Sequence, residues 1–439
     1  MESFVTEQRN HVSVHVLPTR RYINRYIHLS IVNVQGRIPP MVFAVIMRML
    51  FKVSSVAAGK RELHHQLWSI GVNEIKFDLE HKGDMQVASI RMHMPADVLP
   101  RTQERMQMAM NLLAELLYGS SLAGGSNSKL HRKVGAEEAQ IQEELIWAEH
   151  YAGYNSSAWD EVVRGRCMES LGYIGRPTAQ DLKQLRTCVQ EGELKKWYSE
   201  VLRSPFHVHI IGDVQPDTMI RQVLDIFMPA FIMADNEHSS PVILNSRSAE
   251  QQKLGEMMLE LADIQQCKLN VAFTTGVTYG SSDYAALFLF HSLFGASPAS
   301  RLNLELRERK QWVYQIYSTL DDYRGTLHVT TGTSSSYVTD VLEAIDAQWM
   351  RLCGGDINEA EMNRAVQNMM HYVQVGLDLP EQMVKLHLDR LLHQVEMTTQ
   401  QFLEAVSCVT SEEIAVVASR MNKALTWILY PESEYTGTA

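Results

Sequence analysis

The chain has 439 residues, of which 45% are hydrophobic and 21% charged, enough apolar material for the cores of about two to four globular domains. Its net charge of −11 argues against a general nucleic-acid-binding protein. The five cysteines are scattered and form no Cys-x-x-Cys pair, which excludes a thiolate zinc site and favours a reducing compartment. The N-terminal residues lack an apolar signal segment and the longest apolar run is too short to span a bilayer, so we expect a cytoplasmic protein without membrane contact.

The first half of the chain alternates between strand-like and helix-like patterns. A buried helix is expected directly behind Pro39 and Pro40, because that segment is apolar over most of its surface. The expected elements are strands at Val12–Leu17 and Tyr26–Val34, helices at Met41–Lys52 and Lys60–Ile70, strands at Glu74–Glu80 and Gln86–Met94, helices at Val98–Tyr118, Ser128–Tyr151, Asp160–Ser170 and Ala179–Leu202, and a strand at Phe206–Ile211.

The second half repeats this order of elements. Residues 229–250 are rich in Pro, Ser and Asn, which indicates a linker between domains at 1–228 and 251–439. The sequence therefore predicts an α+β protein with two tandem, similar domains. The expected elements are strands at Lys268–Thr275, Trp312–Thr319, Thr326–Thr331 and Leu425–Tyr430, and helices at Ser281–Phe294, Ser300–Lys310, Tyr337–Leu352, Asn358–Val375, Pro380–His393, Thr398–Val406 and Ser411–Met421.

Residues 300–317 combine the end of a helix with the beginning of a strand. Arg307 leaves the end of the helix, and Tyr314 follows seven residues later in the strand. A guanidinium group and a phenol held close together can both donate hydrogen bonds to one carbonyl oxygen. By themselves, these residues are explained more simply as a surface arginine and a half-buried strand tyrosine.

The seventeen histidines form no recognisable zinc motif. Neither His-Glu-x-x-His nor His-x-x-Glu-His occurs in the chain. His207 and His209 share one face of a strand, which is workable ligand spacing, but no third ligand is evident from the sequence. We therefore expect no metal in this chain and no catalytic nucleophile motif of the Gly-x-Ser-x-Gly type.

The tandem halves and the segment SRLNLELRERKQWVYQIYS resemble the pitrilysin (insulinase-type) zinc peptidases, in the half-size class that works as dimers. The resemblance covers essentially the whole chain. It implies, for each domain, a mainly antiparallel sheet packed with helices, as in the mitochondrial processing peptidases. In that family the arginine and tyrosine at the positions of Arg307 and Tyr314 reach into the active site and stabilise the tetrahedral intermediate.

The first half departs from the pattern of active family members. These carry His-x-x-Glu-His on the first buried helix, before a segment like Met49–Lys52, and the motif positions here hold Ala44, Met47 and Arg48. None of these side chains replaces a zinc-binding imidazole or the general base. Glu137 and Glu144 have the seven-residue spacing of the family's later glutamates, so Glu144 is a candidate leftover ligand; for both we prefer a solvated helix face.

The resemblance implies the non-catalytic subunit of a heterodimeric peptidase. An HxxEH-containing homologue would bind the zinc, and Arg307 and Tyr314 would complete its site on a bound peptide such as the leader of a ribosomally made peptide. A second interpretation is a catalytically inert peptide-binding or scaffold homodimer. A third is an independent enzyme with a different site around His207 and His209.

Overall fold

The computed structural model describes residues 3–34, 37–51, 57–72, 75–95, 102–118, 136–152, 159–173, 179–232 and 255–435. The chain forms two compact units, the first from residues 1–153 and 177–243 and the second from residues 154–176 and 244–439. The expected boundaries at 1–228 and 251–439 therefore differ from the observed division, because residues 154–176 lie with the second unit. The expected linker lies outside the described residues, except that residues 229–232 end a helix.

The first unit is built on a six-stranded sheet in the order β1-β2-β6-β3-β5-β4. Only β2 and β6 pair in parallel, and the other neighbours are antiparallel. The central strands are buried along nearly their whole length. The strands are β1 (Val5–Arg9), β2 (Val12–Pro18), β3 (Arg25–Val34), β4 (Lys76–Lys82), β5 (Met85–Met94) and β6 (Phe206–Gly212).

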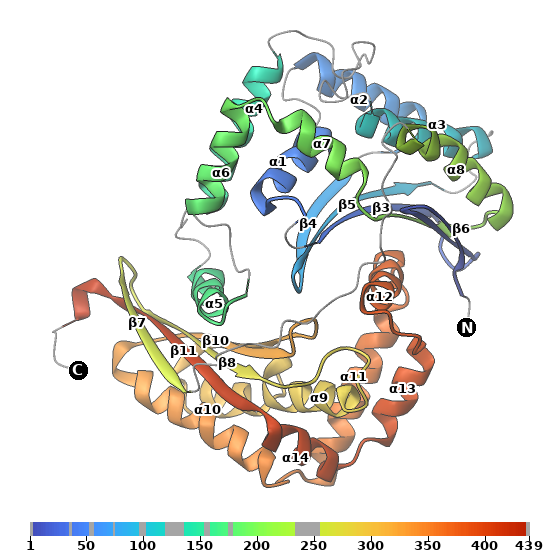
Figure 1. Ribbon diagram of the computed structural model, residues 1–439. Helices are drawn as coiled ribbons and strands as arrows, with labels where there is room; N and C mark the ends of the chain where they lie inside the picture. Colours follow the sequence, from blue (N-terminus) through green and yellow to red (C-terminus); the bar gives the residue numbers. More distant parts are fainter. Residues whose placement is uncertain are drawn as a thin grey trace. The chain divides into compact units, whose positions relative to one another are not determined.

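Helices of the first unit cover one face of this sheet (Figure 1). Their core includes almost every described side chain of the first helix, which explains its continuous apolar sequence. The helices are α1 (Pro40–Phe51), α2 (Ala57–Ser69), α3 (Thr102–Tyr118), α4 (Ala136–Ala152), α6 (Ala179–Gln190), α7 (Leu194–Leu202) and α8 (Pro216–Ile232).

The second unit repeats the topology of the first around a five-stranded sheet in the order β7-β11-β8-β10-β9. Its first strand again pairs in parallel with its last strand, and the remaining pairs are antiparallel. The two sheets thus match strand for strand, with β1 as an addition to the first. The strands are β7 (Glu256–Ala262), β8 (Cys267–Thr274), β9 (Val313–Asp321), β10 (Thr326–Thr333) and β11 (Asn422–Pro431).

Helices pack on both faces of the second sheet (Figure 1). Leu269, Val271 and Phe273 face the main helical layer, whereas Ala272 faces α5 (Trp159–Ser170) and packs with Cys167. Two segments of this layer are π-helical, η2 (Ser292–Ala296) and η3 (Asn303–Arg309). The other elements are α9 (Tyr284–His291), η4 (Ser335–Tyr337), α10 (Val338–Cys353), α11 (Glu359–Gly376), α12 (Pro380–His393), α13 (Thr399–Cys408), α14 (Ser411–Arg420) and η5 (Glu432–Glu434).

The expected α+β fold with two repeated units is confirmed, and three elements were missed. The sequence analysis assigned no structure to β1, α8 or β7. β1 is a short edge strand of mostly exposed residues, so it carries no clear alternation. β7 alternates well but follows directly on the segment interpreted as a linker. Within the described part of the chain, no helix is long and apolar enough to cross a membrane.

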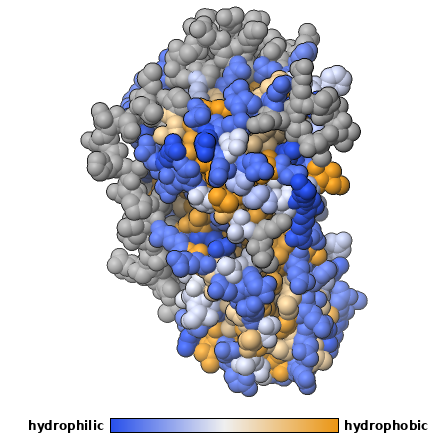
Figure 2. All heavy atoms as spheres, turned by 90° about the vertical axis from the view of Figure 1, so that its right-hand side faces the viewer, coloured by the Kyte–Doolittle hydropathy of each residue, from blue (hydrophilic) through white to orange (hydrophobic). Residues whose placement is uncertain are grey.

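Polar and charged side chains dominate the molecular face displayed in Figure 2, where apolar side chains form only small areas. Some polar groups are nevertheless buried in the cores. His328 of β10 is 2% exposed, and its ring nitrogens contact Asn270 Oδ1 at 3.0 Å and Thr326 Oγ1 at 3.3 Å. Burial, together with the nearby Arg164 charge, lowers the pKa of His328 from 6.5 to about 3.

We predict that His328 makes the protein sensitive to acid. Between about pH 3 and pH 6.5 the unfolded chain binds a proton that the folded chain does not, so stability present above pH 6.5 is lost as the pH falls. The loss from this group at pH 4 is on the order of 3 kcal/mol. Urea unfolding at pH 7 and pH 4 should show a smaller difference for His328→Gln than for the unmodified chain; equal differences would contradict the prediction.

Candidate functional site

The three positions that the resemblance assigns to the zinc motif, Ala44, Met47 and Arg48, lie on α1. Ala44 is 1% exposed and Met47 is fully buried, and both belong to the first unit's tightly packed interior. Arg48 follows in the last turn of the helix, with a side chain that is 14% exposed. The apolar packing of α1 therefore accounts for the first two substitutions without any catalytic role.

Arg48 makes a close ion pair with the glutamate of the facing helix. Its Nε atom donates to Glu144 Oε2 at 2.6 Å, and its guanidinium carbon lies 3.8 Å from the centre of the Trp147 ring. Glu144 is 1% exposed, so the expected solvated helix face is wrong for this residue. Glu144 is buried because α4 packs against α1 and because Arg48 balances its charge. The side chain of Glu137 lies outside the described residues.

These four side chains do not fit the zinc ion that the family resemblance implies. A catalytic zinc site needs three protein ligands and an open position for water. Of Ala44, Met47, Arg48 and Glu144, only the carboxylate is a suitable ligand, and it accepts a hydrogen bond from a permanently charged guanidinium group. The guanidinium group of Arg48 lies beside Glu144, where a zinc ion would have to bind.

Arg307 and Tyr314 lie next to each other at the surface of the second unit. The guanidinium carbon of Arg307 is 6.0 Å from the centre of the Tyr314 ring, and Tyr314 is 85% exposed. Arg307 is about half exposed, and its Nε atom lies 3.6 Å from Glu308 Oε1 of the same turn. The structure thus brings the two predicted residues together and leaves the donors of both accessible.

A rigid frame supports this exposed pair. Arg301 makes two 2.7 Å contacts with the carboxylate of Glu361 on α11. Asn303 donates to the carbonyl groups of Ser297 and Ile316 at 3.1 and 3.0 Å. Gln311 has a left-handed backbone (φ 55°) that ends the π-helical segment and turns the chain into β9. These contacts hold residues 300–317 in place, and we call this segment the braced junction. Arg307 and Tyr314 therefore lie on a supported segment rather than on a free loop.

Side chains also occupy backbone carbonyl groups along the outer edge of β9. Ser318 O contacts His291 Nε2 at 3.0 Å, two residues beyond the carbonyl of Ile316 that Asn303 occupies. Because β10 pairs with the other side of β9, these two carbonyl groups face away from the sheet. A peptide could not use them to extend the sheet without displacing both side chains.

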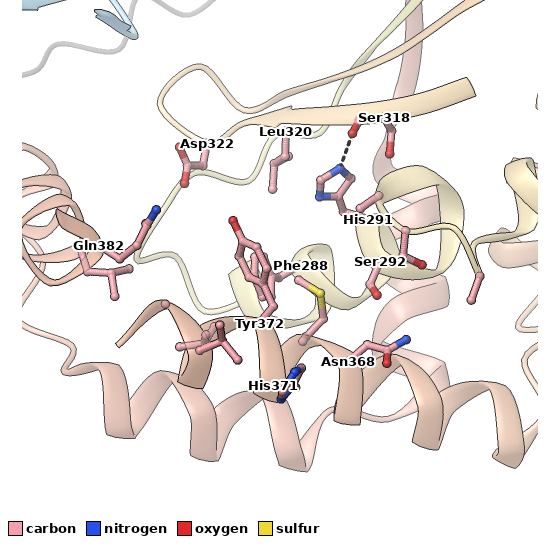
Figure 3. Close-up of a pocket in the computed structure, with 18 of the residues that line it drawn as sticks. Phe288, His291, Ser292, Ser318, Leu320, Asp322, Asn368, His371, Tyr372 and Gln382 are labelled. Atoms are coloured by element: carbon pink, nitrogen blue, oxygen red, sulfur yellow. Dashed lines mark hydrogen bonds between the residues drawn. The ribbon is translucent and has the colours of Figure 1, made fainter. Parts of the chain in front are cut away.

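A cavity of about 870 Å³ lies beside His291 in the second unit (Figure 3). Its walls come from α9, η2, β9, α11 and α12, and in Figure 3 the aromatic rings of Phe288 and Tyr372 point toward its centre. Tyr284 donates to Asp322 at 2.9 Å, and burial lowers the pKa of His291. A cavity with a mostly apolar surface and several polar side chains along its walls is suited to a ligand or a side chain.

The topology relates this cavity to the degenerate zinc positions. α9 follows the second strand of its unit's repeat as α1 does, and α11 corresponds to α4. In the first unit, α1 and α4 hold the Arg48–Glu144 ion pair. In the second unit, the corresponding helices α9 and α11 border the cavity. The cavity was not predictable from the sequence, because its walls come from segments between residues 284 and 386 that share no motif.

His207 and His209 lie in a larger group of histidines than the sequence indicated. His15 on β2 pairs in register with His209 on β6, and His28 on β3 pairs with His209 from the other side. Burial lowers the pKa of His207 to about 4 and, with the charges of Arg91 and Lys82, that of His28 to about 3. Both imidazoles are therefore neutral at pH 7.

Comparison with known proteins finds relatives among the M16 peptidases. Residues 189–369 match the model of the peptidase M16 inactive domain. A probable inactive metalloprotease of Bacillus subtilis, YmfF, is 22% identical over 379 residues, which cover 85% of this chain and 84% of the relative. A conserved protein from Enterococcus faecalis V583 superposes with a TM-score of 0.81 at 19% identity, over 99% of this chain and 100% of the other.

A peptidase M16 inactive domain from Pseudomonas fluorescens has the same fold, with a TM-score of 0.68 at 14% identity and 98% of each chain covered. Such identities show the fold alone, whereas the family model matches the sequence itself. The matched residues include the junction that carries Arg307 and Tyr314. Residues 189–369 thus resemble an M16 inactive domain, and the whole chain has the two-domain fold of M16-like peptidases.

Proposed function

We propose that this protein is the non-catalytic subunit of a heterodimeric M16 zinc peptidase. The observation that carries the proposal is the contrast between its two candidate sites. A buried ion pair fills the zinc positions, while Arg307 and Tyr314 remain adjacent, braced and accessible. The relative from Bacillus subtilis is itself described as a probable inactive metalloprotease.

The Arg48–Glu144 pair supports the loss of independent activity. Zinc binding would require Arg48 to leave Glu144, which would strand a charge in the interior and cost about 3–5 kcal/mol. Even then Ala44 and Met47 would supply neither an imidazole nor a general base. Zinc, activated water and the general base would therefore come from an HxxEH-containing partner.

Arg307 and Tyr314 would contribute donors to that partner's site. A guanidinium group and a phenol hydroxyl can donate to the carbonyl oxygen of a peptide and stabilise the negative charge that develops on it. The braced junction reduces the reorganisation needed when substrate arrives. The proposed substrate is a peptide, such as the leader of a ribosomally made peptide, and the proposed location is the cytoplasm.

A catalytically inert scaffold that forms a homodimer is the second candidate. β7 is an edge strand with large apolar side chains exposed on one face, with Met257 60%, Leu259 45% and Leu261 41% exposed. An unpaired edge of this kind favours association with another chain. A homodimer that binds peptides but adds nothing to a partner's catalysis would support this candidate instead.

We predict that Arg48 and Glu144 stabilise the fold only as a pair. Arg48→Met and Glu144→Gln should each lower the free energy of unfolding by about 3–5 kcal/mol, because each leaves a polar partner uncompensated in the interior. The double variant Arg48→Met/Glu144→Gln should cost less than the sum of the single changes. Urea denaturation measures all three; additive losses would show that the ion pair is not the relevant interaction.

We predict that Arg307 and Tyr314 act in catalysis by the complex. With an HxxEH-containing partner, Arg307→Ala and Tyr314→Phe should each reduce kcat/KM for peptide cleavage by about 100- to 1000-fold, as for the loss of one oxyanion donor. Arg309→Ala is the matched control, because Arg309 lies in the same segment with a 75% exposed side chain that pairs with Glu305.

Size-exclusion chromatography should show that all three variants still form the heterodimer. Full activity in both the Arg307→Ala and the Tyr314→Phe complexes would refute the assigned roles. Zinc-dependent cleavage by the isolated chain would refute the proposed function as a whole.

A further inference from the structure

A compact group of imidazoles occupies one face of the first sheet. Val14, Val16, Val208 and Ile210 point into the helical core. Side chains alternate along a strand, so His15, His207 and His209 point to the opposite face. The parallel pairing of β2 with β6 places His15 directly beside His209 and two residues from His207.

His15 lies close to each of the other two rings, whereas His207 and His209 are farther apart, so a ring must turn for all three to share one metal ion. His15 Nε2 lies 3.2 Å from His207 Nδ1, and the ring nitrogens of His15 and His209 come within 4.8 Å. Ring centres are 4.4 Å apart for His15–His209, 5.4 Å for His15–His207 and 6.4 Å for His207–His209. Two nitrogens bound to one tetrahedral zinc ion at 2.0–2.1 Å are about 3.3 Å apart.

We propose that His15, His207 and His209 bind a divalent transition-metal ion of the zinc type. Imidazole nitrogen is a preferred ligand for this class of ion, and three such ligands leave a fourth position for water or another donor. The site is separate from α1 and from the motif positions Ala44, Met47 and Arg48. It does not depend on the proposed role as a peptidase subunit.

The surroundings suit the neutral, oriented imidazoles that a metal requires. Thr6 Oγ1 contacts His15 Nδ1 at 2.9 Å, so the hydroxyl group can fix the ring with Nε2 toward His207. Burial keeps His207 unprotonated at neutral pH. His28 makes a T-shaped contact with His209, and its buried Nε2 has no hydrogen-bond partner among the described residues.

Charges near this group do not oppose a cation strongly. Arg91 and Lys82, which lie near His28, are paired with Asp78 and Glu80 at 3.1 and 3.4 Å. We leave His28 outside the ligand set because these two cations lie closest to it. The competing explanation is a stack of neutral histidines that only hydrogen-bond to one another, which would have no affinity for metal.

The test is metal binding by the full-length chain after treatment with a chelator. We expect one Zn²⁺ per chain in competition with a chromophoric chelator, and tetrahedral absorption bands with Co²⁺. His15→Ala and His207→Ala should weaken zinc binding at least about tenfold, and Thr6→Val about 10- to 100-fold. His64→Ala and His65→Ala are the controls, since both residues are exposed on α2 and should leave binding unchanged.

His207→Gln serves as a second variant if alanine prevents folding, because glutamine keeps size and hydrogen bonding but is a poor zinc ligand. Circular dichroism confirms that each variant is folded. The proposal is overturned if the folded chain binds no zinc. It is equally overturned if zinc binding survives in His207→Gln but is lost in Glu144→Gln, which would assign the metal to α1 and α4.

Discussion

The ion pair between Arg48 and Glu144 is the constraint on which the interpretation of this molecule depends. It lies between two packed helices, with side chains 14% and 2% exposed, and Trp147 covers the guanidinium group. A buried carboxylate needs a positive partner, and a metal ion and an arginine are alternative ways to provide one. Arginine gives a closed site, because it occupies the coordination space and cannot release a proton at any relevant pH. The same helix pair can therefore be retained as structure while its metal chemistry is absent.

Repetition of one topology makes the two units comparable position by position. In the first unit the space between α1 and α4 is filled by the ion pair, whereas in the second the space between α9 and α11 opens into a cavity bordered by His291. The second unit also places π-helical turns around this cavity and before β9. Such turns widen a helix locally and are frequent at functional positions. One architecture thus gives a closed, charged site in one unit and an open, largely apolar one in the other.

Much of the fold was predictable because it depends on local patterns. The apolar run of α1, the helix-to-strand change at residues 300–317 and the repeated order of elements are all legible in the sequence. The environment of Glu144 was not, because its partner Arg48 is 96 residues away and a single carboxylate on a helix is normally solvated. His15 was missed for the same reason, since 192 residues separate it from His207. Sequence spacing reports neighbours along an element, whereas strand pairing between distant segments decides which side chains meet.

Tyr314 lies at the surface of the second unit, with most of its side chain in solvent. A side chain that is 85% exposed buries little apolar area and contributes little to stability. Yet the junction that carries it is held by a buried arginine, by an asparagine that caps two carbonyl groups and by a left-handed residue. Stability alone explains Arg301 and Asn303, whose side chains are largely buried, but not a phenol and a guanidinium group exposed side by side. Exposed donors on a supported junction are what the proposed contribution to a partner's site would require.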